Sequence, residues 1–304
     1  MSITNYPNGL SSFGQNLYGN GTQPDTSGNT FFMDLNVANS GDGKSWDEAV
    51  STVAAALALA DTDIGNSAIR AWARRNTVYA CGDGIAEALV LASEKTDLIG
   101  VGTDVGSFPK ITGNFTIGTA VNGFRIFNMG FVPTTTAPCI TFPAGMHGWE
   151  LHGVTIYKVE GLVNTSGIQA ITSRDWVMNG VRICPDAGGA YNTIAFTLTT
   201  NTAGIGRSII DNCLFVGTEA FDVADGGYFE GSICKNSTFI ATALCIDDNS
   251  DSIAFVDNNL ITAATITTKA GAGVVDWNAV LAAGNYATGA DTNGPLPDLA
   301  AHTS

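Results

Sequence analysis

The residues best suited to chemistry are carboxylates that recur at similar places along the chain. Asp211 and Asp257 hold the same place in two repeated segments, with Lys235 at that place in the segment between them. Asp247 and Asp248 come shortly before the last segment. Glycoside hydrolysis uses two carboxyls about 5–5.5 Å or 6.5–9.5 Å apart, which side chains one coil apart on a stacked structure can supply. Asp beside a tight turn also bonds its own backbone, and we favour that structural role.

A second group of acids could hold a cation. Glu219, Asp222 and Asp225 are spaced three residues apart in a glycine-containing stretch, and Glu230 follows. The spacing lacks an EF-hand pattern, so solvated acids are the favoured interpretation. The six cysteines form no CxxC pair and there are three histidines, which argues against a zinc site. We expect no catalytic residue, cofactor or metal.

Aromatic and thiol side chains fit an interior better than a binding surface. Trp149 and Trp176 each stand just before a repeated segment, where they can form an internal stack or a platform for sugar rings. Cys213 and Cys234 fall at places expected to face inward, where a small apolar thiol packs well.

Composition narrows the class of partner. The chain has 304 residues, of which 13% are charged, with 28 acidic against 13 basic residues and a net charge of −15. Such a charge repels nucleic acid and anionic lipid surfaces. The sequence begins without the basic and apolar pattern of a signal peptide, and it contains no apolar run of membrane-spanning length. We therefore expect synthesis in the cytoplasm, and no nucleic-acid or membrane partner.

An internal repeat predicts the architecture. Six segments align without gaps, each with apolar residues at alternate places and Asn or Gly at the fourth place, and these anchors recur every 22–32 residues. Asn and Gly tolerate the left-handed backbone of a one-residue corner, and stacked Asn amides can bond one another. The anchors of this expected corner ladder are Asn128, Gly153, Gly180, Asn212, Asn236 and Asn258.

The pattern predicts a mainly β, right-handed parallel β-helix with one N-terminal capping α-helix and an extended N-terminal arm. Residues 45–60 carry the helical signal, with Ser45 as N-cap, and residues 97–101 are expected to form a first full coil. The alternative is a β-sandwich, in which hairpin turns would recur every 8–12 residues. We expect four regions: an arm over 1–30, a strand and capping helix over 31–75, coils over 76–275 and a C-terminal cap and tail over 276–304.

The opening segment 3–14 (ITNYPNGLSSFG), followed by 31–34 (FFMD) and 41–46 (GDGKSW), resembles β-helical virion proteins of tailed bacteriophages. The coil pattern is similar to the pectin-lyase-like β-helix superfamily. This resemblance implies a structural component of a virus particle, a head decoration, cement or appendage protein that forms a homotrimer, and it implies no catalytic residues.

The arm is the expected docking element. Its turn-rich sequence has no periodicity of its own, yet it carries aromatic residues that can dock on another subunit or on the chain's own coils. We expect it to bind the major capsid protein or other virion proteins. The expected docking residues are Tyr6, Pro7, Phe13, Leu17 and Tyr18.

The competing hypothesis is a tailspike-like protein that binds or cleaves surface glycans. Enzymes resembling polygalacturonase join an Asp-Asp pair to Gly-His-Gly and Arg-x-Lys motifs. Asp247 and Asp248 form such a pair here, but both partner motifs are missing. We therefore expect a non-enzymatic protein.

Overall fold

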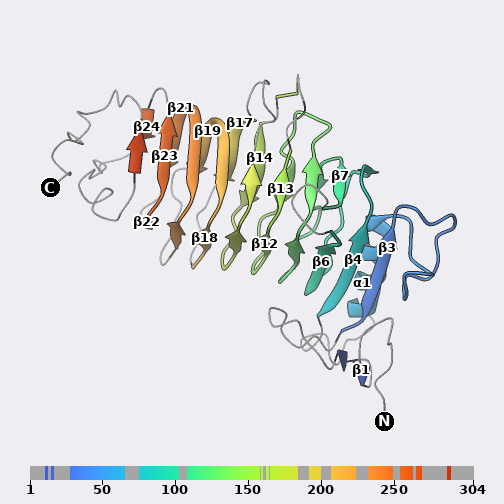
Figure 1. Ribbon diagram of the computed structural model, residues 1–304. Helices are drawn as coiled ribbons and strands as arrows, with labels where there is room; N and C mark the ends of the chain where they lie inside the picture. Colours follow the sequence, from blue (N-terminus) through green and yellow to red (C-terminus); the bar gives the residue numbers. More distant parts are fainter. Residues whose placement is uncertain are drawn as a thin grey trace, which may run out of the picture.

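The computed structural model describes residues 11–12, 15–16, 28–65, 75–102, 108–157, 159, 162–163, 165–183, 192–199, 207–223, 232–248, 254–262, 265–268 and 286–288. In this part of the chain, strands stack in parallel along one long axis, with the helix beside the first strands (Figure 1). This parallel β-solenoid with one N-terminal helix confirms the expected fold class. The sandwich alternative is wrong, because the strands of both large sheets pair in parallel.

The first sheet holds one strand from every coil and positions the main candidate site. Its neighbouring strands pair in register, for example Ile126 with Leu151 and Leu151 with Met178. β3 and β4 stack ahead of β6, so the coil at 97–101 is the third level of this sheet and not the first. The strands in stacking order are β3 (Thr30–Asp34), β4 (Asn76–Cys81), β6 (Thr96–Gly100), β9 (Arg125–Phe127), β12 (Glu150–His152), β15 (Val177–Asn179), β18 (Ile209–Asp211), β20 (Ile233–Lys235) and β22 (Ala254–Val256).

The other two sides of the coil form a second, branched sheet. One branch contains β5 (Ile85–Ala86), β7 (Lys110–Thr112), β10 (Gly130–Val132), β13 (Thr155–Ile156) and β16 (Arg182–Ile183). The other contains β8 (Phe115–Thr116), β11 (Ile140–Phe142), β14 (Ser166–Ile171) and β17 (Asn192–Thr199). The branches merge at β19 (Leu214–Val223), whose start pairs with β16 and whose end pairs with β17. β21 (Thr238–Asp248), β23 (Asn259–Thr262), β24 (Thr265–Thr268) and β25 (Tyr286–Thr288) follow. A separate hairpin pairs β1 (Ser11–Ser12) with β2 (Gln15–Asn16).

The corner after each first-sheet strand explains the repeat. Five of the six expected anchors have left-handed backbone angles, with φ between 51° and 65°: Asn128, Gly153, Gly180, Asn212 and Asn236. The sixth corner is Asp257 (φ 54°) and not Asn258, because Cys234 pairs with Phe255 and Lys235 with Val256. The expected position of this last corner was therefore wrong by one residue.

A second left-handed column precedes the first-sheet strands and was not predicted. Among the described residues, it lies two residues before Asp97 and two residues before the first place of the first four repeated segments, where the chain enters the sheet. It consists of Lys95, Gly123, Gly148, Asp175 and Arg207. Mixed residue types hide this corner from a pattern search, because three of its five members are not the Gly or Asn that a left-handed turn favours.

The core is a continuous stack of apolar and aromatic side chains. Trp149 and Trp176 are fully buried, and their ring centroids lie 4.8 Å apart with an interplanar angle of 3°. Phe142 stacks on Trp149 at 4.0 Å, and Trp149 Nε1 donates to Ser173 Oγ at 3.2 Å. Both tryptophans therefore belong to the interior and not to a sugar platform.

The helix begins later than expected. α1 spans Val53–Gly65, not 45–60, and it buries one face that includes Leu57 and Ile64. The expected N-cap Ser45 accepts a hydrogen bond from Glu48 N in a turn ahead of the helix. Thr52 Oγ1 accepts from Ala55 N at the actual start, and the Glu87 carboxylate accepts from Val53 N at 2.8 Å and Ala54 N at 2.9 Å.

Among the described helical residues, no segment is long and apolar enough to cross a membrane. The proposed region boundaries at residues 30, 75 and 275 stay predictions. The expected docking residues Tyr6, Pro7, Phe13, Leu17 and Tyr18 lie outside the described residues.

Candidate functional site

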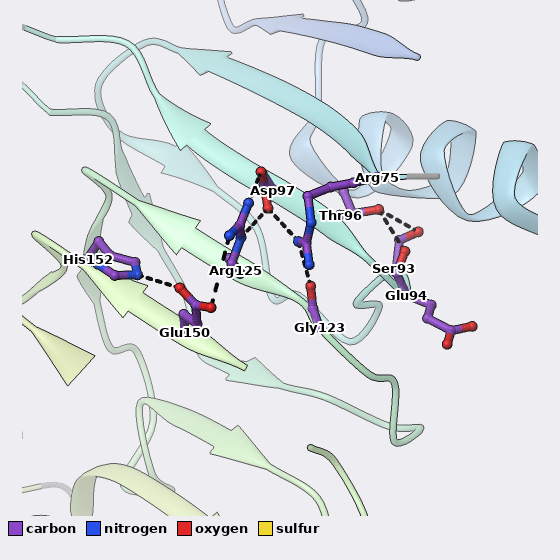
Figure 2. Close-up of polar contacts among 9 residues, drawn as sticks. All are labelled: Arg75, Ser93, Glu94, Thr96, Asp97, Gly123, Arg125, Glu150 and His152. Carbon is purple, nitrogen blue, oxygen red and sulfur yellow. Dashed lines mark hydrogen bonds and ion pairs between the residues drawn. The ribbon is translucent and has the colours of Figure 1, made fainter. Parts of the chain in front are cut away.

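A network of charged side chains lies on the outer face of the first sheet (Figure 2). Asp97, Arg125 and Glu150 occupy one row, because the register pairs Asp97 with Arg125 and Arg125 with Glu150 on successive strands. Their neighbours at the next place along each strand are fully buried in the core, so alternation turns the charged row outward. We call Arg75, Asp97, Arg125, Glu150 and His152 the polar network.

Asp97 is the centre of the polar network. Arg125 donates from Nε to Oδ1 and from Nη2 to Oδ2, each at 2.7 Å, which is the bidentate geometry of a strong charge-assisted pair. Arg75 Nη1 donates to the same Oδ1 at 2.7 Å and also to the carbonyl oxygen of Gly123 at 2.8 Å. Asp97 has no exposed surface although it lies on the outside of the sheet, because these guanidinium groups cover it.

Glu150 and His152 extend the network toward solvent. Glu150 Oε1 lies 4.0 Å from Arg125 Nη1, and Glu150 Oε2 lies 2.7 Å from His152 Nε2. The imidazole stacks on the Phe127 ring at 4.8 Å and 7°, and the Arg125 guanidinium lies 5.4 Å from the centroid of that same ring. Each side chain of the Glu150–His152 pair keeps more than a quarter of its surface exposed, so the pair is open to proton exchange.

The charges within the network shift its titration in predictable directions. Burial alone would raise the pKa of Glu150, but the hydrogen bond with His152 and the charge of Arg125 outweigh it and lower that pKa. Burial would likewise lower the pKa of Arg125, and the hydrogen bonds and charge of Asp97 raise it instead. The pKa of Tyr79 is raised by burial and by the charge of Asp97. These directions favour the charged forms of Glu150 and Arg125.

Chemically, the network can stabilise the sheet, and one of its pairs could move a proton. Asp97 is enclosed and cannot reach a substrate. His152, held by a carboxylate through one ring nitrogen, is arranged as an oriented base would be. Arg125 is almost fully buried and already bonded, which makes it a poor ligand for a bound anion.

A second group of ionisable residues lies on the second sheet. We call Glu219, Asp222 and Asp247 the acidic cluster. Asp222 and Asp247 pair in register on neighbouring parallel strands, and Thr197 Oγ1 donates to Asp222 Oδ2 at 2.8 Å. Burial and the charge of Asp247 raise the pKa of Asp222, and burial together with both aspartates raises that of Glu219. The structure thus joins two motifs that the sequence suggested separately.

The expected carboxylate pairing across the repeats is wrong. Asp211 does occupy the outward third place, where its Oδ2 lies 3.4 Å from Lys235 Nζ and its Oδ1 accepts from Asn236 Nδ2 at 2.9 Å. Asp257 occupies the corner instead of the third place, since Val256 is the register partner of Lys235. Asp211 therefore contacts side chains of the next coil, and not its own backbone as we expected.

Hydrogen bonding at the corners also differs from the simple amide ladder. Asn236 donates to Asp211 and not to a neighbouring corner amide. Asn258 is buried inside the corner, where Oδ1 accepts from Ser237 N at 2.9 Å and Nδ2 donates to Cys234 O at 3.0 Å. Cys213 and Cys234 face inward as expected.

The proposed cation site is covered only in part. Asp225 and Glu230 lie outside the described residues, and Glu219 and Asp222 belong to the acidic cluster. Within the described ranges, no group of three or more His, Cys, Asp or Glu side chains is arranged to hold a metal ion.

Sequence reasoning missed the polar network, although part of its signal was available. The aligned segments already place Arg125 and Glu150 at the same first position, and the earlier coil supplies Asp97. Arg75 comes from outside the aligned segments, so only the folded chain brings it to Asp97.

Comparisons with known proteins add one similarity. No protein-family model matches the chain, and a search of curated proteins finds no match. Among solved structures, the A-module of the mannuronan C-5 epimerase AlgE4 of Azotobacter vinelandii is similar, with 12% identity over 84% of this chain and 88% of that one, at a TM-score of 0.33. A TM-score of this size carries no argument, so the parallel β-helix rests on the strand register described above.

Proposed function

We propose that this chain is a non-enzymatic structural protein of a bacteriophage virion, a head decoration, cement or appendage protein. It associates with its own copies as a homotrimer and docks on the particle through the arm over residues 1–30. The major capsid protein or another virion protein is the proposed partner.

One observation carries the structural part of this proposal. The polar network directs its charged groups at one another, and its central carboxylate, Asp97, is enclosed by Arg75 and Arg125. A catalytic carboxylate must reach its substrate, whereas an enclosed ion pair joins neighbouring coils and resists their separation. This arrangement supports a rigid scaffold.

The virion assignment is supported by the sequence. Segments 3–14, 31–34 and 41–46 resemble β-helical virion proteins, and two of these segments lie next to one another in the structure. Phe32 N donates to Gly43 O, and Val50 N donates to Phe32 O, so the 41–50 stretch packs along β3 at the N-terminal end of the stack. β3, which follows the proposed arm in the sequence, lies at this end of the stack, so attachment through the arm is expected to leave the coils free.

Docking is tested by sedimentation of partially assembled particles with added protein. The full-length chain is compared with a full-length variant carrying Tyr6→Ser, Phe13→Ser and Tyr18→Ser, and with Thr141→Ser on a coil as the matched control. The proposal predicts that the wild-type chain and the control sediment with particles and the arm variant does not. Failure of the wild-type chain to bind any particle would overturn the virion role.

A second candidate function, glycan binding or cleavage, is favoured by the acidic cluster. Asp222 and Asp247 lie on strands about 4.8 Å apart, close to the carboxyl spacing of retaining glycosidases. The raised pKa of Asp222 suits a general acid. Reducing-end release from surface polysaccharides tests this function, with Asp222→Asn as the inactivating variant and Asp211→Asn as its control. Cleavage that only Asp222→Asn abolishes would replace the structural proposal with an enzymatic one.

A further inference from the structure

The outer face of the first sheet carries carboxylates and basic groups in nearly equal number, in a chain that is strongly acidic overall. We call this surface the first-sheet face; it consists of the outward side chains of the nine stacked strands together with Arg75, which lies over Asp97. The chain has a net charge of −15. Among the described residues, this face has four carboxylates and three Lys or Arg side chains. Asp97, Glu150 and Asp211 have the basic partners Arg75, Arg125 and Lys235. The fourth carboxylate, Asp34 at the end of β3, accepts hydrogen bonds from Asn36.

The same face carries apolar side chains in regular rows. Val177, Ile209 and Ile233 continue the row of Arg125 and Glu150 on the following strands, because the register pairs them in turn. Ile209 is 41% exposed, which is unusual for an isoleucine on a sheet. A parallel row holds Tyr79, Ile99 and Phe127 on β4, β6 and β9. The face thus combines apolar rows with paired charges.

The second sheet has a different surface. Asp222 and Asp247 project outward there, since their neighbours Phe221 and Ile246 are buried in the core. Burial and the charges of both aspartates raise the pKa of Glu219 beside them, as expected where carboxylates lie close together. A second copy of this chain would meet like charge at the acidic cluster, whereas three of the four carboxylates of the first-sheet face already have a basic partner.

We propose that the first-sheet face is where copies of this chain pack on one another, with their long axes parallel and their coils in step. This proposal rests on the proposed function, in which copies of the chain associate with one another, and it identifies the surface through which they do so. Side chains in each row repeat at the strand spacing of about 4.8 Å, and a second copy has rows with that same repeat. Aliphatic side chains of one copy can therefore fill the gaps between those of the other at several levels.

The polar network reduces the cost of this contact. Moving charges out of water is expensive unless they are already paired. Asp97 has no exposed surface and Arg125 has 8%, so little of this ion pair is left to desolvate when another copy covers it. The network therefore fits inside an interface more easily than exposed lysines or carboxylates would.

A glycan fits this face less well than a second copy. Sugar binding uses the flat faces of aromatic rings, but Phe127 and His152 stack on each other at 4.8 Å and 7°. Phe32 and Tyr79 are stacked in the same way at 5.9 Å. Because the faces of these rings contact one another, mainly their edges are left for a partner to contact. Ring edges suit packing against side chains better than stacking on a sugar.

Sedimentation velocity of the full-length chain tests the proposal. Ile209→Glu places a charge within the apolar row of the first-sheet face, and Thr141→Glu places the same charge on the outer surface of the second sheet as the matched control. We expect the wild-type chain and Thr141→Glu to sediment as oligomers of the 31.4 kDa chain, and Ile209→Glu as the monomer. Far-ultraviolet circular dichroism checks that both variants keep the β-helix.

Two results would overturn the inference: a monomeric wild-type chain, or an Ile209→Glu variant that folds and stays oligomeric. Spin labels at N179C, in a Cys81→Ser background, supply a second measurement. Asn179 is exposed on the first-sheet face, so labels on neighbouring copies should couple there and not at T141C. The particle-sedimentation assay tests a different claim. A chain that forms oligomers but does not bind particles would refute docking on the virion and leave the proposed interface between copies unaffected.

Discussion

Replacing Asp97 by asparagine should loosen the coils around β6 and β9 far more than the same change at Asp211 loosens the coils around it. Asp97→Asn keeps the size of the side chain but removes the charge that holds two guanidinium groups at 2.7 Å. Breaking a buried ion pair by removing one partner costs about 3–5 kcal/mol, because the other charge is left uncompensated. We expect about 3 kcal/mol here, since Glu150 lies 4.0 Å from Arg125 and can take over part of the pairing.

Hydrogen exchange measured by mass spectrometry is the appropriate assay, because a solenoid opens locally rather than as one cooperative unit. A loss of about 3 kcal/mol corresponds to roughly 150-fold faster exchange of the amides in β6 and β9. In the control Asp211→Asn, the lost partner is a half-exposed lysine 3.4 Å away, so about 1 kcal/mol or less is expected.

The double variant Asp97→Leu with Arg125→Met sharpens this test. Apolar side chains of similar volume remove both buried charges, so we expect exchange to return most of the way to the wild-type rate. Equal and small effects of Asp97→Asn and Asp211→Asn would refute the reasoning, because they would mean that enclosure adds nothing to the strength of the Asp97 pair.

Three further predictions follow from local geometry. Glu87→Ala removes two hydrogen bonds from the start of α1 and should cost about 1 kcal/mol, measured as faster amide exchange in the helix, whereas unchanged exchange would contradict the capping role. Asp222→Asn should raise the melting temperature at neutral pH, because the raised pKa of Asp222 means that its charged form destabilises the folded chain. As the pH falls toward about 4, Asp222 becomes protonated and the wild-type chain regains this stability, so the difference between the two melting temperatures should disappear. Gly153→Ala should lower the melting temperature more than Gly180→Ala. Both glycines have positive φ, but a Cβ at Gly153 would lie 2.8 Å from the Asn128 side-chain oxygen, whereas a Cβ at Gly180 would have no atom closer than 3.8 Å. Equal losses would show that backbone strain alone decides the cost.

The fold could be predicted because the corner after the first-sheet strands is chemically demanding. Left-handed backbone at Asn128, Asn212 and Asn236 selects Asn, and Gly replaces it in two coils, so the period is visible in the sequence. The last corner was misplaced because three consecutive residues, Asp257, Asn258 and Asn259, all suit a turn. Only the pairing of Phe255 with Cys234 decides among them.

The helix start could not be located from local signals alone. Ser45 and Glu48 look like an N-cap and its first turn, but the chain first pairs with β3, where Asp34 N donates to Val50 O. The helix then begins at Val53, beside the Glu87 carboxylate, which comes from a later coil. A cap contributed from 34 residues away leaves no local pattern to read.

The candidate site was the least predictable part. Asp97 and Arg125 are 28 residues apart and Arg75 lies outside the repeated segments, so their meeting depends on the register of three stacked strands. The acidic cluster was foreseen as two separate motifs, one with Glu219 and Asp222 and one with Asp247. The strand pairing of β19 with β21 joins them.

Electron cryomicroscopy of partially assembled virus particles incubated with the full-length chain tests the central claim most directly. The account predicts rod-shaped density on the particle surface, with layers about 4.8 Å apart, attached at the end of the stack where β3 and α1 lie. Particles whose surface is unchanged after incubation, imaged beside particles saturated with a known decoration protein, would contradict the structural role.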